Sequence, residues 1–279
     1  VWGRFIRDTP AVYIEHDVAS LYLNGGKNPP LPGWGRVIDL LEWMRSLRWE
    51  VTEGRRYARI VALSPEDEAV LRPLLPDSSV TSVKHGTNFA QFYAPYREVE
   101  EPTLIFIGSF VHYPNVEALG YFRREIWPRI RREVPGARLL VVGSHPTAEV
   151  RRFGEEPGVE VAGRVPDVGE WLDRAAVFVA PMRKGFGMKG KVLEAMARGK
   201  PVVTTPVGMR GAAVVPGRHL LIGGSPASFA AAAVSLLRDP SLRRRIALAG
   251  QELVREEYDW SKAAEQMDRI YDELLGEAG

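Results

Sequence analysis

The 279-residue chain has no cysteine, and this absence excludes a disulfide framework, a thiolate zinc site and a cysteine nucleophile. Long apolar runs are also missing, since none approaches the ~18–20 residues that a membrane-spanning helix needs. The formal net charge of +2 is too small to indicate a nucleic-acid partner. These absences favour a globular protein of a reducing compartment, and we expect a cytoplasmic location. Arginine-rich stretches at 129–132 and 243–245 leave peripheral contact with an anionic membrane surface as an alternative.

Short β-branched runs alternate with longer helical patterns along the chain, which predicts an α/β fold of βαβ units around a parallel sheet. The polar, proline-flanked stretch 93–102 is predicted to link two domains. Residues 103–255 hold enough strands for a complete doubly wound, Rossmann-like domain, whereas residues 1–92 supply only about three, few for an independent core. We expect strands at 11–15, 59–63, 80–84, 104–107, 139–142, 159–161, 177–179, 202–204 and 220–222, and a long helix at 37–57.

The most informative segment is 181–201, in which a glycine-rich turn follows an apolar strand and opens a helix at about Met188. Such a turn leaves backbone N–H groups unpaired, and the helix dipole adds positive charge to them. Gly185 and Gly187 allow close backbone approach, and Lys189 can supply a full charge. Four of the chain's seven lysines fall within 184–200. This pattern predicts a phosphate site at the carboxyl end of a parallel strand, where open α/β sheets bind their ligands.

Glu194 lies on the same helix, off its apolar stripe and three residues after Lys191. One interpretation is an ion pair along the helix surface, worth about 0.2–0.5 kcal/mol. The other is a carboxylate that faces a ligand beside the phosphate loop. Residue type alone leaves both interpretations open.

The segment 191–208, Lys-Val-Leu-Glu-Ala-Met-Ala-Arg-Gly-Lys-Pro-Val-Val-Thr-Thr-Pro-Val-Gly, resembles the donor-binding signature of the GT-B-fold retaining glycosyltransferases of family four, the glycosyl transferases group 1. Further blocks resemble the same family, in the family's order, at 106–109, 112–118, 141–143, 163–168, 215–219 and 258–260. Together they cover nearly all of residues 103–275. A weaker resemblance extends to 11–17, which ends a strand in His16, and to 83–88.

The resemblance implies a GT-B-like fold and transfer of a sugar from a nucleotide-sugar donor to an acceptor with retention of configuration. The implied catalytic residues are His16, Lys189 and Glu194. The implied donor-binding residues are Gly108, Ser109, Val165, Gly185, Phe186, Gly187, Met188, Lys189, Lys191 and Glu194. In this assignment Glu194 binds the ribose and Lys189 holds the diphosphate with nearby amides, while the Val165 backbone contacts the base. His16 would face the donor sugar, although a hydrogen-bonded histidine at a strand end explains it equally well.

One position departs from the family pattern. Eight residues before Glu194 the family usually carries a second acid, and this chain carries Phe186, so the sugar hydroxyls lack that partner. No Asp-x-Asp triplet occurs, and no histidine pair has metal-ligand spacing. We therefore expect metal-independent chemistry with no cofactor, in which cationic side chains and the helix dipole neutralise the leaving diphosphate.

The resemblance also implies that strands preceding Ala11 in the family are absent. We therefore expect a partial N-terminal domain on the acceptor side at 1–92, and a C-terminal helix at 256–279 that crosses back to it. The chain would then be a fragment, or a second copy or another chain would complete it through the exposed sheet edge, or the shortened protein would work differently. The acceptor stays open between a saccharide, a lipid and a protein. Two alternatives are a non-catalytic nucleotide-sugar-binding module and, less favoured, a GT-B-fold nucleotide-sugar 2-epimerase.

Overall fold

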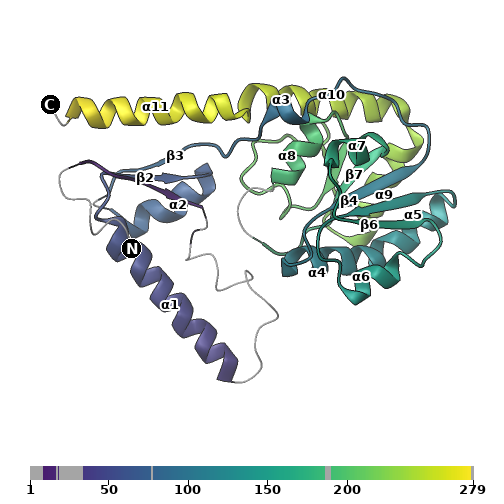
Figure 1. Cartoon of the computed structure of the whole chain (residues 1–279), viewed down its shortest axis with the longest axis horizontal. Helices are drawn as coiled ribbons and strands as arrows, with labels where there is room; N and C mark the ends of the chain where they lie inside the picture. The colour runs from purple at the N-terminus through teal and green to yellow at the C-terminus, as the bar shows by residue number, and fades with distance from the viewer. Residues whose placement is uncertain (1–8, 17, 19–33, 77, 186–189, 278–279) are drawn as a thin grey trace. The chain divides into compact units, whose positions relative to one another are not determined.

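The computed structural model of the protein describes residues 9–16, 18, 34–76, 78–185 and 190–277 (Figure 1). The strands within these residues all pair in parallel, in one sheet of three and one sheet of six. The predicted α/β fold is therefore confirmed. The chain divides into two compact units. The first holds the described residues up to Gly86, Gly185 and those from Trp260 on; the second holds Thr87–Lys184 and the remaining described residues to Asp259.

The first unit is built on a parallel sheet of order β1-β2-β3, with strands Val12–Glu15, Arg59–Ala62 and Val80–Ser82. Its helices are α1 (Trp34–Gly54), α2 (Pro65–Leu74) and α11 (Trp260–Glu277). Successive strand residues point to opposite faces. Accordingly, Ile60 packs with Leu71, from α2, in one buried cluster, whereas Val61 packs with Ile270 and Leu274 of α11 in another. The last helix therefore covers one face of this sheet.

The second unit is a doubly wound sheet of order β6-β5-β4-β7-β8-β9. The strands are β4 (Thr103–Ile107), β5 (Arg138–Val142), β6 (Val159–Gly163), β7 (Val177–Ala180), β8 (Val202–Thr204) and β9 (Leu221–Ile222). The helices are α3 (Phe89–Phe92), α4 (Tyr113–Tyr121), a π-helical turn η3 (Phe122–Ile126), α5 (Trp127–Glu133), α6 (Ala148–Phe153), α7 (Val168–Asp173), α8 (Gly190–Ala197), α9 (Pro226–Arg238) and α10 (Pro240–Glu257). Every residue of β7 and β8 is buried, as expected for parallel strands that are covered on both faces.

The stretch predicted as a linker, residues 93–102, packs on the second unit. Gln251 on α10 donates its amide N–H to the Ala94 carbonyl at 2.8 Å. Arg243, also on α10, pairs with Glu98 through its Nε at 2.8 Å. The N-terminal segment of the first unit ends at Gly86, ahead of this stretch. The predicted division into domains stays a prediction. The structure differs from it in one respect, because residues 93–102 pack on the second unit.

None of the helices in the described ranges is long and apolar enough to cross a membrane.

Candidate functional site

The strand order of the second unit reverses between β4 and β7. From β4 the chain winds outward through β5 and β6, then returns beside β4 at β7 and continues to β8 and β9 on the other side. The loops that leave the carboxyl ends of β4 and β7 therefore run to opposite sides of the sheet. Open α/β sheets bind their ligands at such a switch point. Gly108 and Ser109 begin one of these loops, and the glycine-rich turn that leads to α8 forms the other.

The carboxyl ends of β4 and β5 meet very closely. A Cβ on Gly143 would lie 1.9 Å from the carbonyl oxygen of Gly108, so only a glycine fits there. The backbone N–H of Phe110 donates to the Ser144 carbonyl at 2.9 Å. The Ser144 hydroxyl in turn donates to Ser109 Oγ at 3.0 Å. This contact fixes the Ser109 side chain at the sheet edge where we predict phosphate contacts.

Asn115 links that loop to the start of α8. Its Nδ2 donates to the Ser109 carbonyl at 2.8 Å, and its Oδ1 accepts from Lys191 Nζ at 2.6 Å. The Lys191 ammonium also lies 5.1 Å from the centroid of the Phe106 ring. The sequence predicted Lys191 for this site but not Asn115. The sequence feature that could have pointed to Asn115 is its position in the 112–118 block. No pattern in that block, however, shows which residue the Asn115 amide binds.

Glu194 follows Lys191 by one helical turn and is half-buried. Burial raises the pKa of its carboxyl, and the positive charge of Lys191 opposes that shift. Among the described residues, no hydrogen-bond donor reaches this carboxylate. Gly190 adds space beside it, since even a Cβ there would lie 3.9 Å from Glu194 Oε1. The carboxylate is thus in place to accept hydrogen bonds from a ligand.

The turn between β7 and α8 is anchored on α4 by two cations. Arg183 donates from Nε to Glu117 Oε1 at 3.0 Å, and its guanidinium lies 4.1 Å from the centroid of the Tyr121 ring. The Lys184 ammonium lies 5.2 Å from the centroid of the Tyr113 ring. These contacts assign Arg183 and Lys184 to holding the start of the turn. Gly185 then has a φ of +104°, which side-chain-bearing residues rarely adopt.

The structure brings four of the sequence-predicted residues together at this edge: Gly108, Ser109, Lys191 and Glu194. The predicted residues Phe186, Gly187, Met188 and Lys189 lie outside the described residues. Val165 lies in the loop between β6 and α7 and is half-buried. His16 follows β1 in the first unit, and its side chain is exposed. The roles assigned to these residues stay predictions.

Two other titratable groups have structural partners elsewhere. Burial lowers the pKa of Lys200 to about 8, and its ammonium donates to the Ala175 carbonyl at 3.2 Å, at the amino edge of the sheet. Burial also lowers the pKa of His219, whose Nδ1 accepts from the Val215 N–H at 3.1 Å. In the part of the chain that the structure describes, no group of three or more histidines and acids is arranged to hold a metal ion.

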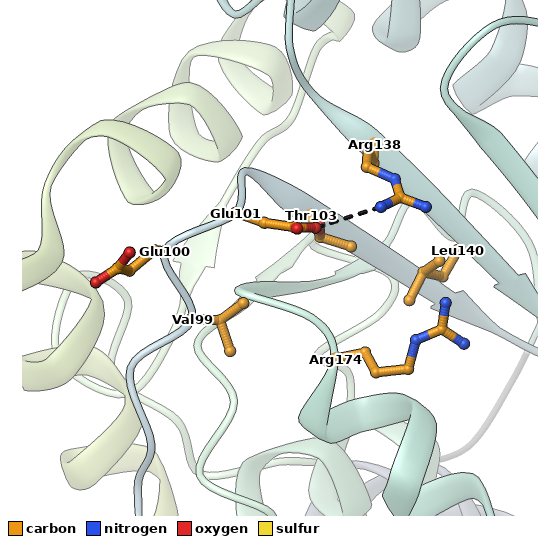
Figure 2. A pocket seen from close by; sticks show the side chains of 7 residues that line it. All are labelled: Val99, Glu100, Glu101, Thr103, Arg138, Leu140 and Arg174. Atoms are coloured by element: carbon orange, nitrogen blue, oxygen red, sulfur yellow. Dashed lines mark hydrogen bonds and ion pairs between the residues drawn. The ribbon is translucent and has the colours of Figure 1, made fainter.

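A hollow of about 300 Å³ opens beside Thr103 and Arg138, the first residues of β4 and β5 (Figure 2). Figure 2 shows the Arg138 guanidinium paired with Glu101, at 3.3 Å. Arg174, which also lines the hollow, pairs with Glu160 at 2.8 Å. The hollow thus lies at the amino edge of the sheet, opposite Gly108, and its guanidinium groups already have carboxylate partners. It is separate from the candidate site.

Residues 101–239 match the family model described as Glycosyl transferases group 1, and over this span the chain belongs to that family. A phosphatidyl-myo-inositol mannosyltransferase of Mycobacterium leprae is 36% identical over 141 residues, which are 48% of this chain and 37% of that protein. A trehalose synthase of Rubrobacter xylanophilus is 28% identical over 259 residues, 87% of this chain and 59% of that protein. The chain therefore spans less than two thirds of either relative.

Solved structures share the fold at low sequence identity. Sucrose-phosphate synthase from Thermosynechococcus elongatus has a TM-score of 0.71 and 22% identity, over 95% of this chain and 68% of that one. HepE from Anabaena, solved with UDP-glucose, has a TM-score of 0.71 and 14% identity, over 95% and 72%. The family and the GT-B-type fold that segment 191–208 predicted are confirmed.

Proposed function

We propose that this protein is a glycosyltransferase that takes its sugar from a nucleotide-sugar donor. The observation that carries the proposal is the arrangement at the switch point, where the Lys191 ammonium, held 2.6 Å from Asn115 Oδ1, lies one helical turn from the half-buried Glu194 carboxylate. A cation for a diphosphate and an acid for a ribose are the groups that such a donor needs. The family match over residues 101–239 supports the same conclusion.

In this proposal the chain stabilises the charge that develops as the sugar–phosphate bond breaks. Lys191 and the predicted Lys189 supply full positive charge, and the N–H groups at the start of α8 add partial charge. Glu194 accepts hydrogen bonds from the ribose hydroxyls and so fixes the nucleoside end. Because Asn115 already holds Lys191, this ammonium needs little rearrangement when the diphosphate leaves.

We further propose that the reaction retains the anomeric configuration and needs no divalent ion. Retention follows from the resemblance of segment 191–208 to retaining enzymes. Independence from metal follows from the cationic groups, which take the role that a bound ion has elsewhere. Activity in EDTA tests the second point, and the anomeric signal of the product in a proton NMR spectrum tests the first.

The donor test is a thermal-shift panel of UDP, GDP, ADP and TDP and their sugars in EDTA. A ligand at about 100 times its dissociation constant stabilises a native protein by about 2.7 kcal/mol. We expect a selective response to one nucleotide and its sugar. A folded sample that responds to none of them would contradict the proposal.

A second assay separates transfer from binding. The nucleotide sugar that responds is incubated with saccharide, lipid and protein acceptors, and transfer and donor hydrolysis are followed. We expect one acceptor class to be glycosylated. Binding without transfer or hydrolysis would favour the non-catalytic module, and conversion of the donor to an epimer without acceptor would favour the 2-epimerase. Light scattering of the same sample tests the predicted second copy.

A further inference from the structure

We propose that Asn115 is a positioning residue for the donor, whose side-chain amide holds the Lys191 ammonium in place for the diphosphate. The inference rests on the proposed function, because it takes Lys191 as a phosphate ligand. Asn115 does not need to touch the donor in this proposal. It acts through a lysine that is 76 residues away in sequence and 2.6 Å away in space.

The chemistry of its partners fixes the orientation of this amide. An ammonium group can only donate hydrogen bonds and a carbonyl can only accept them. Oδ1 of Asn115 must therefore face Lys191, and Nδ2 must face the Ser109 carbonyl, as observed at 2.6 and 2.8 Å. The rotated amide would place NH₂ against NH₃⁺ and oxygen against oxygen. The Asn115 amide therefore joins Ser109 and Lys191 in only one orientation.

The backbone leaves room for this link at one point. A Cβ on Gly108 would lie 2.8 Å from Cγ of Asn115, closer than real Cβ contacts. The bare Cα of Gly108 therefore makes space for the amide at the end of β4. Gly108, predicted from the sequence as a donor-binding residue, acquires a second role here, because it permits Asn115 to reach Lys191.

The choice of a neutral amide matters for the charge of the site. Asn115 accepts from the ammonium through an uncharged oxygen, and the Phe106 ring faces the same ammonium at 5.1 Å without adding a formal charge. Arg183, by contrast, is bound by the carboxylate of Glu117. A lysine side chain has much rotamer freedom to lose on binding a ligand. Holding it beforehand lowers that cost, and holding it with an amide adds no negative charge against the diphosphate.

The test measures dissociation constants by calorimetry for UDP, GDP, ADP and TDP and for their four nucleosides, using the full chain. The variants are Asn115→Ala, Asn115→Asp, Lys191→Ala and the double variant Asn115→Ala with Lys191→Ala. Gln251→Ala is the matched control, since its amide also donates to backbone carbonyls, those of Ala94 and Ala197, each at 2.8 Å. It removes a buried amide at the far end of α8 from Lys191.

We expect Asn115→Ala to weaken binding of the diphosphate about fivefold, the effect of roughly one hydrogen bond, and to change nucleoside binding less than twofold. Asn115→Asp weakens the diphosphate further, because its carboxylate pairs with the ammonium. On the Lys191→Ala background, Asn115→Ala has no additional effect, which is the signature of a residue that acts through Lys191. Gln251→Ala leaves the ratio of diphosphate to nucleoside affinity unchanged.

Equal losses for diphosphate and nucleoside in Asn115→Ala would overturn the inference, as would losses that multiply in the double variant. If Asn115→Ala does not fold, Asn115→Ser, alone and combined with Lys191→Ala, gives the same comparison. A wild-type chain that binds none of the four diphosphates would instead reject the proposed function, and the inference with it. If the wild type binds a diphosphate and Asn115→Ala binds it equally well, the inference fails while the proposed function stands.

Discussion

Arg183 and Glu117 join the turn before α8 to helix α4, with the arginine Nε 3.0 Å from the glutamate Oε1. The Arg183 side chain is about half exposed, while the Glu117 side chain is only 9% exposed and its Oε2 has no hydrogen-bond partner. The pair is therefore asymmetric, because the glutamate depends on the arginine more than the reverse. It fixes the start of the turn that is predicted to carry the phosphate ligands.

Removing the arginine alone should cost more than removing both partners. Arg183→Ala leaves a buried carboxylate without its donor, and we expect a loss of about 1–3 kcal/mol in the free energy of unfolding. The double variant Arg183→Ala with Glu117→Ala should recover part of that loss, since no unpaired charge remains. Urea denaturation of the three chains measures both effects. An Arg183→Ala variant as stable as the wild type would show that the pair is unimportant.

Gly143 should tolerate no side chain. Alanine at this position would place its Cβ 1.9 Å from the Gly108 carbonyl oxygen, a backbone atom that cannot rotate away. We expect Gly143→Ala to lower the free energy of unfolding by more than about 3 kcal/mol, because losses of this size arise from steric conflicts that the structure cannot relieve. Gly224→Ala is the control, because a Cβ there meets nothing within 4 Å. Thermal unfolding of both variants decides the matter, and a similar midpoint for the two would contradict the close approach.

Glu194 should make the protein less stable at neutral pH than a neutral residue would. Burial raises the pKa of this carboxyl in the folded state, so the folded chain holds the proton to higher pH than the unfolded chain. Stability is therefore lost as pH rises through that window. Glu194→Gln should unfold at a higher temperature than the wild type at pH 7.5, with the difference shrinking below the ordinary glutamate pKa. The same variant should bind nucleotide more weakly. A pH-independent difference would argue against the burial effect.

Lys200 should act in the opposite direction on the alkaline side. Its folded-state pKa of about 8 lies below that of the unfolded chain, so the folded state loses its proton first and stability rises with pH above about 8. Lys200→Met removes this dependence. Between pH 7 and pH 10 the free energy of unfolding of the wild type should thus rise relative to that of Lys200→Met. Parallel slopes for the two chains would show that the ammonium is well solvated.

Much of the fold could be predicted because parallel strands covered on both faces are continuous apolar runs. The runs expected at 139–142, 177–179 and 202–204 are β5, β7 and β8 within one residue. The helix expected at 37–57 begins at Trp34 and ends at Gly54, since its ends carry few capping signals. Local sequence is therefore sufficient to predict a helix or strand whose own pattern of apolar residues determines it.

The site was predictable in part, because Lys191 and Glu194 lie on one helix at a spacing that the sequence shows directly. The roles of Asn115 and Glu117 could not be predicted, because each depends on a distant partner. Asn115 binds Lys191, 76 residues away in sequence, and Glu117 binds Arg183, 66 residues away. The same reason explains the stretch 93–102. It is polar like a linker, but Glu98 finds Arg243, which is 145 residues further along the chain. Contacts between distant polar residues leave no periodic pattern in the sequence.

The most direct test of the account is a calorimetric titration, in EDTA, of wild type and Lys191→Ala with the nucleoside diphosphate that gives the largest thermal shift. We expect the wild type to bind it, and Lys191→Ala to bind it about tenfold more weakly, the effect of one charge-assisted contact. The matching nucleoside should bind the two chains equally well. A Lys191→Ala variant that binds the diphosphate within twofold of the wild type would contradict the assignment of this sheet edge as the donor site.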